Sequence, residues 1–199
     1  MADLPYRTMA ANSDLGAAAA QPASGAFDVA VNFNPATRQF AIDVTLIGAR
    51  ITVTDAAGSG SSGSLKLFTF AQAALAILGA RQNYTKFREG TALTTAAGDA
   101  AFVMGLGSAA ANAGDGALTG TEVDIGAVTA TMTLSGSPAT ATGTKISGAG
   151  LNTSAGLDGT STAIDIYLNW SGSAATIDAT STIDVWGTLT IAGVLLGDD

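Results

Sequence analysis

The sequence contains no Cys and no His, and only 12% of its 199 residues are charged. Without thiols the chain can form neither disulfides nor thiolate sites. Without imidazole it lacks the usual general base near neutral pH and the side chain that most often binds transition metals. Ser-His-Asp and Cys-His catalysis are therefore excluded. A pair of carboxylates is the remaining hydrolytic chemistry, but no spacing of the acids singles out such a pair. We predict no enzyme activity, no cofactor and no metal site.

Long apolar runs are also missing. No stretch approaches the about 20 predominantly apolar residues that a membrane-spanning helix needs, and the first 16 residues lack the apolar segment of a secretory signal peptide. Leu, Ile, Val and Phe together supply only 44 residues, so the hydrophobic core is expected to be thin. A thin core with little surface charge favours oligomerisation, because neighbouring subunits can bury what the monomer leaves exposed.

Basic residues are scarce and unevenly placed. The formal net charge is −8, and residues 100–199 contain nine acids but Lys145 as their only base. This acidic balance argues against nucleic-acid binding, which needs Lys and Arg to neutralise phosphates. Arg81, Lys86 and Arg88 form the densest basic cluster. It is either a solvated strand edge or a patch that docks on an acidic partner surface.

Alternation with a period of two is the main structural signal. "AFDVAVNF" and "QFAIDVTLI" (27–33 and 40–46) each place large apolar residues on one face, and "NPAT" between them supplies turn residues. These segments predict an antiparallel hairpin with one apolar face and one wet face. A further short strand is expected through Ile51 and Val53.

The remaining segments also favour β-structure. "AAGSGSSGS" (56–64) predicts a flexible loop. Residues 70–80 are ambiguous between helix and strand, and we favour strand because Gly79 interrupts a helical run and Tyr84, Thr85 and Phe87 favour sheet. Further strands are expected in four ranges, with a bulge or bend at Gly187. The ranges are 127–135, 138–147, 162–171 and 181–195.

About ten short strands without βα alternation or a fixed repeat predict an all-β fold, an antiparallel β-sandwich or jelly-roll-like domain. Residues 1–25 are expected to form an N-terminal arm, either extended or flexible, and residues 26–199 a single domain.

Several possible sites are weak. "GLGSAA" (Gly105, Gly107, Ala110) fits a dinucleotide motif, but the glycines that follow exclude the helix that such a site needs. The loop 112–124 gathers Asn112, Asp115, Glu122 and Asp124, oxygen ligands of the type that Ca²⁺ prefers, yet without EF-hand spacing. We expect these loop acids to be solvated.

Aromatic and threonine residues suggest two further alternatives. Trp170 and Trp186, with Tyr167, would form a sugar-stacking platform if they lay together on an exposed loop, but in strands they are more often core or interface residues. Thr129, Thr131 and Thr133 would suit an ice-binding face only on a flat, regular solenoid, for which the sequence shows no repeat.

Several phrases together resemble a group of tailed-bacteriophage proteins that are encoded near the major capsid protein, the capsid decoration (cement) proteins. They occur in the order "VTDAAGSGSSGSLKLFTF", "ILGARQNYTKF", "LTTAAGDAAFVMGLGSAA", "ALTGTEVDI", "GTSTAIDIYLNW" and "GTLTIAGVLL". The resemblance spans about Ile51 to Leu195, and the phrases are low in complexity.

This resemblance implies a β-rich virion structural protein, made in the host bacterial cytoplasm. It would bind the major capsid protein on the outer surface of an icosahedral shell and bridge capsomers as a homotrimer. No functional residue is carried over from the family. Among the bases of this chain, the expected capsid contacts are Arg7, Arg81, Lys86 and Arg88. The alternative is a receptor- or glycan-binding module of a fibre or adhesin.

Overall fold

The computed structural model describes residues 7–9, 15–19, 26–55, 60–91, 100–112, 117–127, 129, 131–134, 140–149, 156–172 and 181–197. Within these ranges the chain is all-β, and its one helical element is the 3₁₀ turn η1 (Gly120–Glu122). The strands are β1 (Arg7–Met9), β2 (Gly16–Ala18), β3 (Ala26–Asn34), β4 (Gln39–Asp55), β5 (Ser61–Phe70), β6 (Ala74–Thr91), β7 (Ala100–Gly107), β8 (Met132–Leu134), β9 (Thr140–Ala149), β10 (Gly156–Asp158), β11 (Asp165–Gly172) and β12 (Ser181–Gly197).

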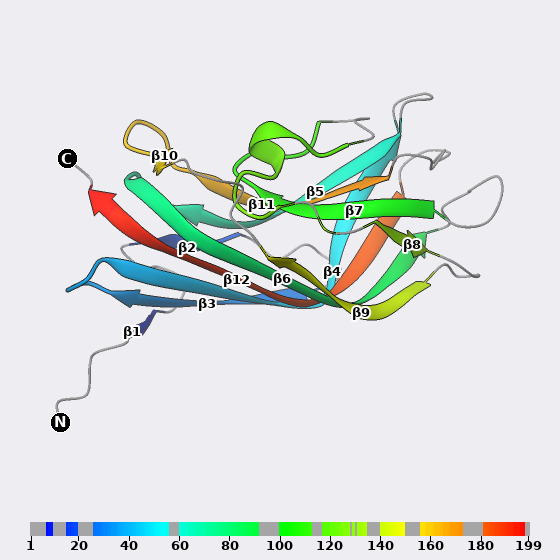
Figure 1. Cartoon of the computed structure of the whole chain (residues 1–199), viewed down its shortest axis with the longest axis horizontal. Helices are drawn as coiled ribbons and strands as arrows, with labels where there is room; N and C mark the ends of the chain where they lie inside the picture. Colours follow the sequence, from blue (N-terminus) through cyan, green and yellow to red (C-terminus); the bar gives the residue numbers. More distant parts are fainter. Residues whose placement is uncertain are drawn as a thin grey trace.

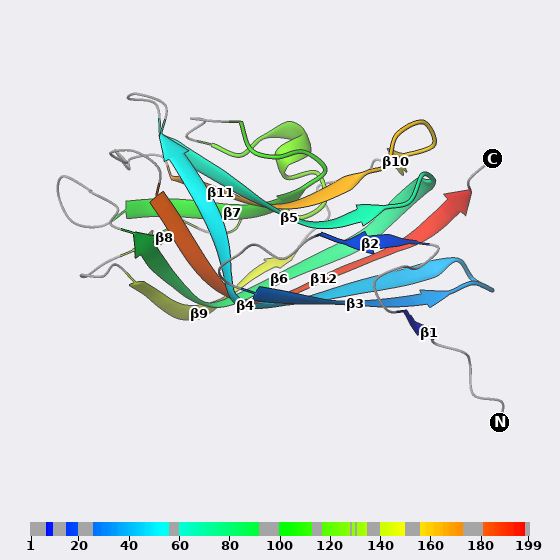
Figure 2. The same ribbon diagram turned by 180° about the vertical axis from the view of Figure 1, so that it is seen from behind.

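The strands form one curled antiparallel sheet in the order β10-β6-β12-β4-β5-β11-β7-β8. β1 joins through β3, β2 pairs with β5, and β9 pairs with β6. The curl resembles half a barrel, in which β3, β4, β12 and β6 lie below and β5, β11 and β7 lie above (Figure 1). The same two levels are visible from behind (Figure 2). The predicted all-β, antiparallel fold is confirmed.

A chain of aromatic rings connects the two levels across the core. Tyr84 on β6 lies 5.3 Å from Phe87, which lies 4.9 Å from Phe102 on β7. Phe102 in turn stacks on Trp170 of β11, with ring centroids 5.9 Å apart. All four side chains are buried. Such ring pairs add stability beyond that of their buried area, so this row of aromatic rings helps to hold the two levels of the curled sheet together.

The hairpin predicted from residues 27–46 is confirmed. β3 and β4 pair in a regular register in which Phe27 faces Leu46 and Phe33 faces Phe40. The turn is closed by Asn34, whose side-chain oxygen accepts hydrogen bonds from the backbone amides of Ala36 and Thr37 at 3.0 and 3.4 Å. This is the local bonding for which Asn is favoured in turns.

The strand expected through Ile51 and Val53 is confirmed, but it is not a separate strand, because it continues β4. Gly48, with φ +69°, is an extra residue of β4, because its neighbours Ile47 and Ala49 pair with two consecutive residues of β12. This bulge reverses the alternation, because Leu46 and Ile51 differ by an odd number of positions and yet both face the core.

Residues 74–80 are strand, as favoured, and belong to β6. The loop predicted at 56–64 was partly wrong, since Ser61–Ser64 begin β5, and residues 56–59 lie outside the described residues. Small residues are required there because β4 and β11 flank this part of β5 closely, and a Cβ on Gly63 would collide with the carbonyl oxygen of Thr52.

Other predicted bounds shift. Among the described residues of the range 127–135, only Met132–Leu134 are assigned to a strand, while β9, β11 and β12 match the three later ranges within a few residues. The described parts of the range 1–25 include β1 and β2, which pair with β3 and β5 of the same chain. Leu15, before β2, is buried in the core. The rest of that range lies outside the described residues.

The bulge predicted at Gly187 is confirmed, because β12 and β6 change register there and leave Thr85 of β6 unpaired. A Cβ on Gly187 would collide with the backbone of Asn83 and Tyr84. By contrast, a Cβ on Gly79 of β6 would meet nothing within 4 Å.

We therefore expect Gly187→Ala to lower the free energy of unfolding by about 1–3 kcal/mol, because the added methyl group overpacks the contact between β12 and β6. The matched variant Gly79→Ala should be neutral or slightly stabilising, since it only restricts the unfolded chain. Urea unfolding of both variants measures the difference, and equal effects would contradict the assigned register.

Candidate functional site

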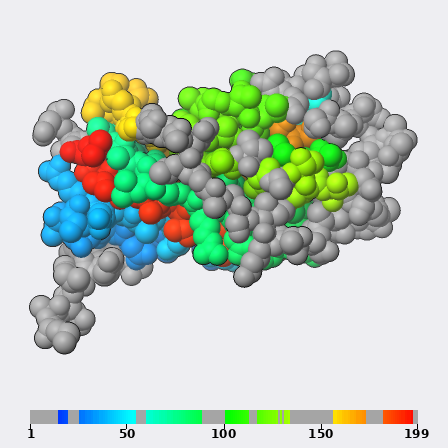
Figure 3. Space-filling model, in the orientation of Figure 1, coloured from blue at the N-terminus to red at the C-terminus, as the bar shows by residue number. Residues whose placement is uncertain are grey.

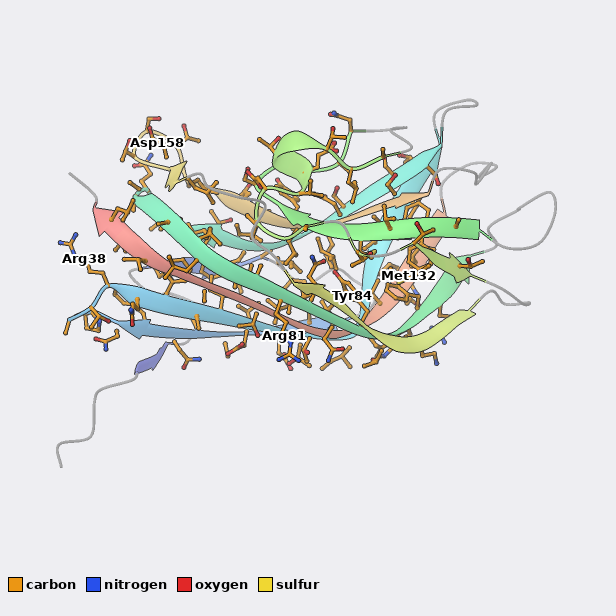
Figure 4. All side chains as sticks on the ribbon, in the orientation of Figure 1. Arg38, Arg81, Tyr84, Met132 and Asp158 are labelled. Atoms are coloured by element: carbon orange, nitrogen blue, oxygen red, sulfur yellow. The ribbon has the colours of Figure 1, made fainter. Side chains whose placement is uncertain are left out.

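The three clustered bases of β6 lie on one face of the sheet, the outer face, which we define as the side of β3, β4, β12 and β6 turned away from the core. A strict alternation would place Arg81 opposite Lys86 and Arg88. The bulge at Thr85 brings all three to the outer face, where Arg81 faces Thr190 of β12 and Lys86 faces Trp186. Figure 4 shows Arg81 on this lower side of the molecule. The fourth predicted contact, Arg7, is in β1.

Asp184 of β12 lies between two arginines of the neighbouring strands. Its register partners are Arg50 of β4 and Arg88 of β6. Arg50 donates from Nε to Oδ1 at 2.6 Å and from Nη2 to Oδ2 at 3.0 Å, and Arg88 donates from Nη2 to Oδ2 at 2.9 Å. The Asp184 side chain is 1% exposed, whereas those of Arg50 and Arg88 are 30% and 45% exposed. One buried negative charge thus holds two surface cations in place.

The ionisation of Asp184 follows from these contacts. Burial acts to raise the pKa of its carboxyl group, but the hydrogen bonds from Arg50 and Arg88, with the attraction of their charges, outweigh burial and lower the pKa below its usual value. The triad therefore carries a net charge of +1 at neutral pH.

Trp186 lies beside this triad and is flanked by both bulges. Its indole covers Gly48, where a Cβ would approach Cζ2 to 3.0 Å. The Lys86 ammonium lies 5.1 Å and the Arg88 guanidinium carbon 5.4 Å from the ring centroid. Both distances allow cation–π attraction. We call Arg50, Lys86, Arg88, Asp184 and Trp186 the cationic patch; its net charge is +2.

Exposed apolar side chains lie on the same strands. Among the described residues, the exposed large hydrophobics are Ile47 (50%), Leu78 (56%) and Leu196 (55%), on β4, β6 and β12. Ile47 is the register partner of Trp186, so it adjoins the cationic patch. Leu78 and Leu196 are unpaired bulge residues nearer the end of β12. An exposed apolar residue beside positive charges is typical of a protein-binding surface.

The opposite side of the molecule carries an open groove of about 570 Å³ beside β11. Its lining includes Asp124, Asp158, Asp165, Tyr167 and small residues. Burial acts to raise the pKa of Asp165, but hydrogen bonds from Lys66 and Thr69 outweigh it and lower that pKa. The groove is acidic and is lined by polar and apolar groups in similar measure, so it can bind polyols or cations, but its lining offers no nucleophile with an activating base.

The proposed aromatic platform is wrong, because the structure separates the two tryptophans. Trp170 is fully buried and stacks on Phe102, whereas Trp186 is partly exposed on the outer face. Tyr167 lines the groove instead. The interpretation of Trp170 as a core residue is confirmed.

The acidic loop 112–124 uses its acids to organise itself, and so the expectation that they are solvated fails for Glu122. This carboxylate is buried and accepts hydrogen bonds from the backbone amides of Asn112 and Thr119 at 2.8 and 2.9 Å. Asp124 accepts two hydrogen bonds from Ser108. Asp115 lies outside the described residues, and within those residues no three acids cluster around a possible metal site.

Gly105 and Gly107 belong to β7 and do not precede a helix in the described chain, as the strand interpretation expects. A Cβ on Gly107 would collide with the backbone of Thr121 and Glu122, so the glycines allow the loop with η1 to lie close to β7. In the threonine series, Thr129 is buried while Thr131 and Thr133 are exposed, so the three do not share one exposed face.

Sequence reasoning missed Asn169, a buried residue of β11 that attaches this loop to the sheet. Its amide donates to the carbonyl oxygens of Ala109 and Glu122 at 2.9 and 2.7 Å. Its side-chain oxygen accepts from Ser64 and from the amide of Ala111. All hydrogen-bonding capacity of Asn169 is thus used. Only its place in an apolar, alternating strand hinted at this role.

Asp184→Asn tests whether the buried carboxylate holds the cationic patch together. A group with a lowered folded-state pKa stabilises the fold above its unfolded pKa of about 3.9, and the stabilisation is lost as pH falls through the folded pKa. We expect the variant to lose about 2 kcal/mol at pH 7 and to show a smaller decline in stability than the original chain below pH ~4. Asp43→Asn, at an exposed acid of the same face, should cost under about 0.5 kcal/mol at pH 7. Chemical unfolding across pH checks this, and an unchanged acid decline in Asp184→Asn would contradict it.

Comparison with known proteins adds no further constraint on this site. The described residues contain no helix that is both long and apolar enough to cross a membrane. No family model, curated protein or solved structure matches the chain.

Proposed function

We propose that this chain is a structural protein of a phage virion that binds the outer surface of an icosahedral capsid and bridges its capsomers. The observation that carries the proposal is the cationic patch. A chain with a net charge of −8 presents, on one rigid face, a net positive surface beside an exposed Ile47. Such a surface suits a partner that offers carboxylates around an apolar contact.

The geometry of the patch favours binding over chemistry. Arg50 and Arg88 are held by Asp184, and Trp186 is held against Gly48, so little side-chain entropy is lost when a partner docks. Trp and Arg are also the residues that most often dominate the energy of protein interfaces. We place the predicted capsid contacts Lys86 and Arg88 at the centre of the interface and Arg81 towards its edge.

The shape of the molecule is consistent with this role. We propose that the two levels of the curled sheet act as the opposed layers of a jelly-roll-like sandwich, which forms a stiff wedge between capsomers. A homotrimer would multiply weak contacts on the shell through avidity, without a titratable catalytic group. Its place would be the virion surface.

The groove favours a second candidate, a glycan- or receptor-binding module. In an open groove, Tyr167 is suited to stacking on a sugar ring, and the three aspartates are suited to accepting hydrogen bonds from its hydroxyl groups. Because the two tryptophans do not lie together, the groove is the feature that supports this alternative. A saturable signal on a glycan array that Tyr167→Ala abolishes, with no binding to shells, would favour it over capsid binding.

Co-sedimentation with empty shells, assembled from the major capsid protein of the same genome, tests the leading proposal. We expect Trp186→Ala to weaken shell binding by at least about 30-fold, because a buried interface Trp contributes about 2 kcal/mol or more. Lys86→Glu should also weaken binding, and the loss should be largest at low ionic strength.

The matched control is Lys66→Glu, which makes the same change in net charge on β5, in the upper level. It should bind shells as the original chain does. The proposal fails if the original chain never sediments with shells, or if Lys66→Glu and Lys86→Glu reduce binding equally.

A further inference from the structure

One end of the molecule carries a cation, an exposed leucine and an anion side by side. Arg38, at the end of the β3–β4 turn, donates from Nη1 to the carbonyl oxygen of Leu196 at 3.1 Å. The Leu196 Cδ1 in turn lies 3.9 Å from the position of a Cβ on Gly156 in β10, the strand that ends at Asp158. We call Arg38, Leu196 and Asp158 the end strip.

The figures agree with these contacts. Figure 4 labels Arg38 and Asp158 at the same end of the molecule, where β12 finishes. In the space-filling view, the blue β3–β4 turn, the red end of β12 and the yellow segment around β10 lie on that end, with the green start of β6 between the red and the yellow segments (Figure 3). The end strip therefore crosses the start of β6, where Ala74 pairs with both Gly197 and Asp158.

Both charges of the end strip can accept another partner. Arg38 is exposed, and its Nε and Nη2 make no hydrogen bond to the described residues, since its contact with Leu196 uses Nη1 alone. Asp158 is also exposed, and its two hydrogen bonds within the described part of the chain, from the amide and hydroxyl of Thr160, both end on Oδ1. These bonds lower the pKa of Asp158, which keeps the carboxylate charged. Leu196 between them is 55% exposed.

We propose that the end strip is a contact between copies of this chain, in which Arg38 of one copy pairs with Asp158 of a neighbouring copy and the Leu196 side chains meet between the pairs. A surface with opposite charges on either side of an apolar centre is complementary to itself under a twofold rotation, so this contact joins copies in pairs and would link neighbouring homotrimers rather than form one. The contact buries Leu196 and leaves no charge unpaired, which a foreign acidic or basic surface could not do for both ends of the strip. This inference rests on the proposed function in one respect, namely that several copies bind to one shell.

Light scattering on purified protein across a concentration series tests the contact. We expect the original chain to self-associate, and Arg38→Asp, which suits the left-handed φ of 55° at that position, to weaken self-association at least tenfold. Asp158→Arg should do the same, and the double variant Arg38→Asp/Asp158→Arg should restore it. Because Asp158→Arg also removes the Thr160 bonds, Asp158→Asn provides a second variant that keeps an acceptor and loses only the charge.

The control is Arg81→Asp, the same substitution at an exposed arginine away from the end strip, which should leave self-association unchanged. The contact is overturned if the original chain stays monomeric at all concentrations, if Arg81→Asp acts like Arg38→Asp, or if the double variant does not recover. Shell co-sedimentation of Arg38→Asp separates the two proposals. If Arg38→Asp still binds shells, but more weakly, the end strip contributes only avidity. If Lys86→Glu loses shell binding and still self-associates, the defect lies in the capsid-binding surface alone.

Discussion

The pairing of β12 with β4 on one side and β6 on the other depends on two unpaired residues, Gly48 and Thr85, which lie opposite Trp186. Each bulge shifts the alternation of its strand by one position. Large apolar residues before and after the bulge can then both face the core, and the polar residues that alternate with them can both face solvent. The same two shifts bring Arg50 and Arg88 to either side of Asp184. The fold and the cationic patch therefore have one structural cause.

The abundance of Gly, Ser and Ala follows from how closely the elements approach one another. Gly63 lies against the backbone of β4, and Gly107 lies against the loop that contains η1. Such contacts leave little room for large side chains, so this region is fixed by buried hydrogen bonds, above all those of Asn169. A buried polar group stabilises a fold only when its partners are complete, and those of Asn169 are. The thin apolar core is supplemented in this way.

The sequence could predict those elements whose structure follows from local alternation of apolar and polar residues alone. The β3–β4 hairpin could be predicted because its alternation runs unbroken from Phe27 to Leu46. The bulge at Gly48 could not, because a glycine in a strand does not reveal which neighbour it faces. The two tryptophans occupy similar alternating segments, yet Trp170 is core and Trp186 surface, since the environment of each is set by strands distant in sequence. The sequence indicated the bases of β6 as a group, and the structure places them on one face, but nothing in the sequence pointed to the buried Asp184 that orders Arg50 and Arg88.

The two proposed surfaces differ in electrostatic character, and this difference would allow the chain to make two independent contacts. The cationic patch keeps a net positive charge because one carboxylate neutralises only one of three cations. Its attraction to an acidic partner acts over distance and is screened by salt. The end strip has no net charge, so its contact depends on short-range pairing and burial of Leu196, which salt affects less. An acidic chain that repels its own copies at a distance needs a neutral surface of this kind for self-contact, because a strongly charged one would either add to the repulsion or compete for the partner of the patch.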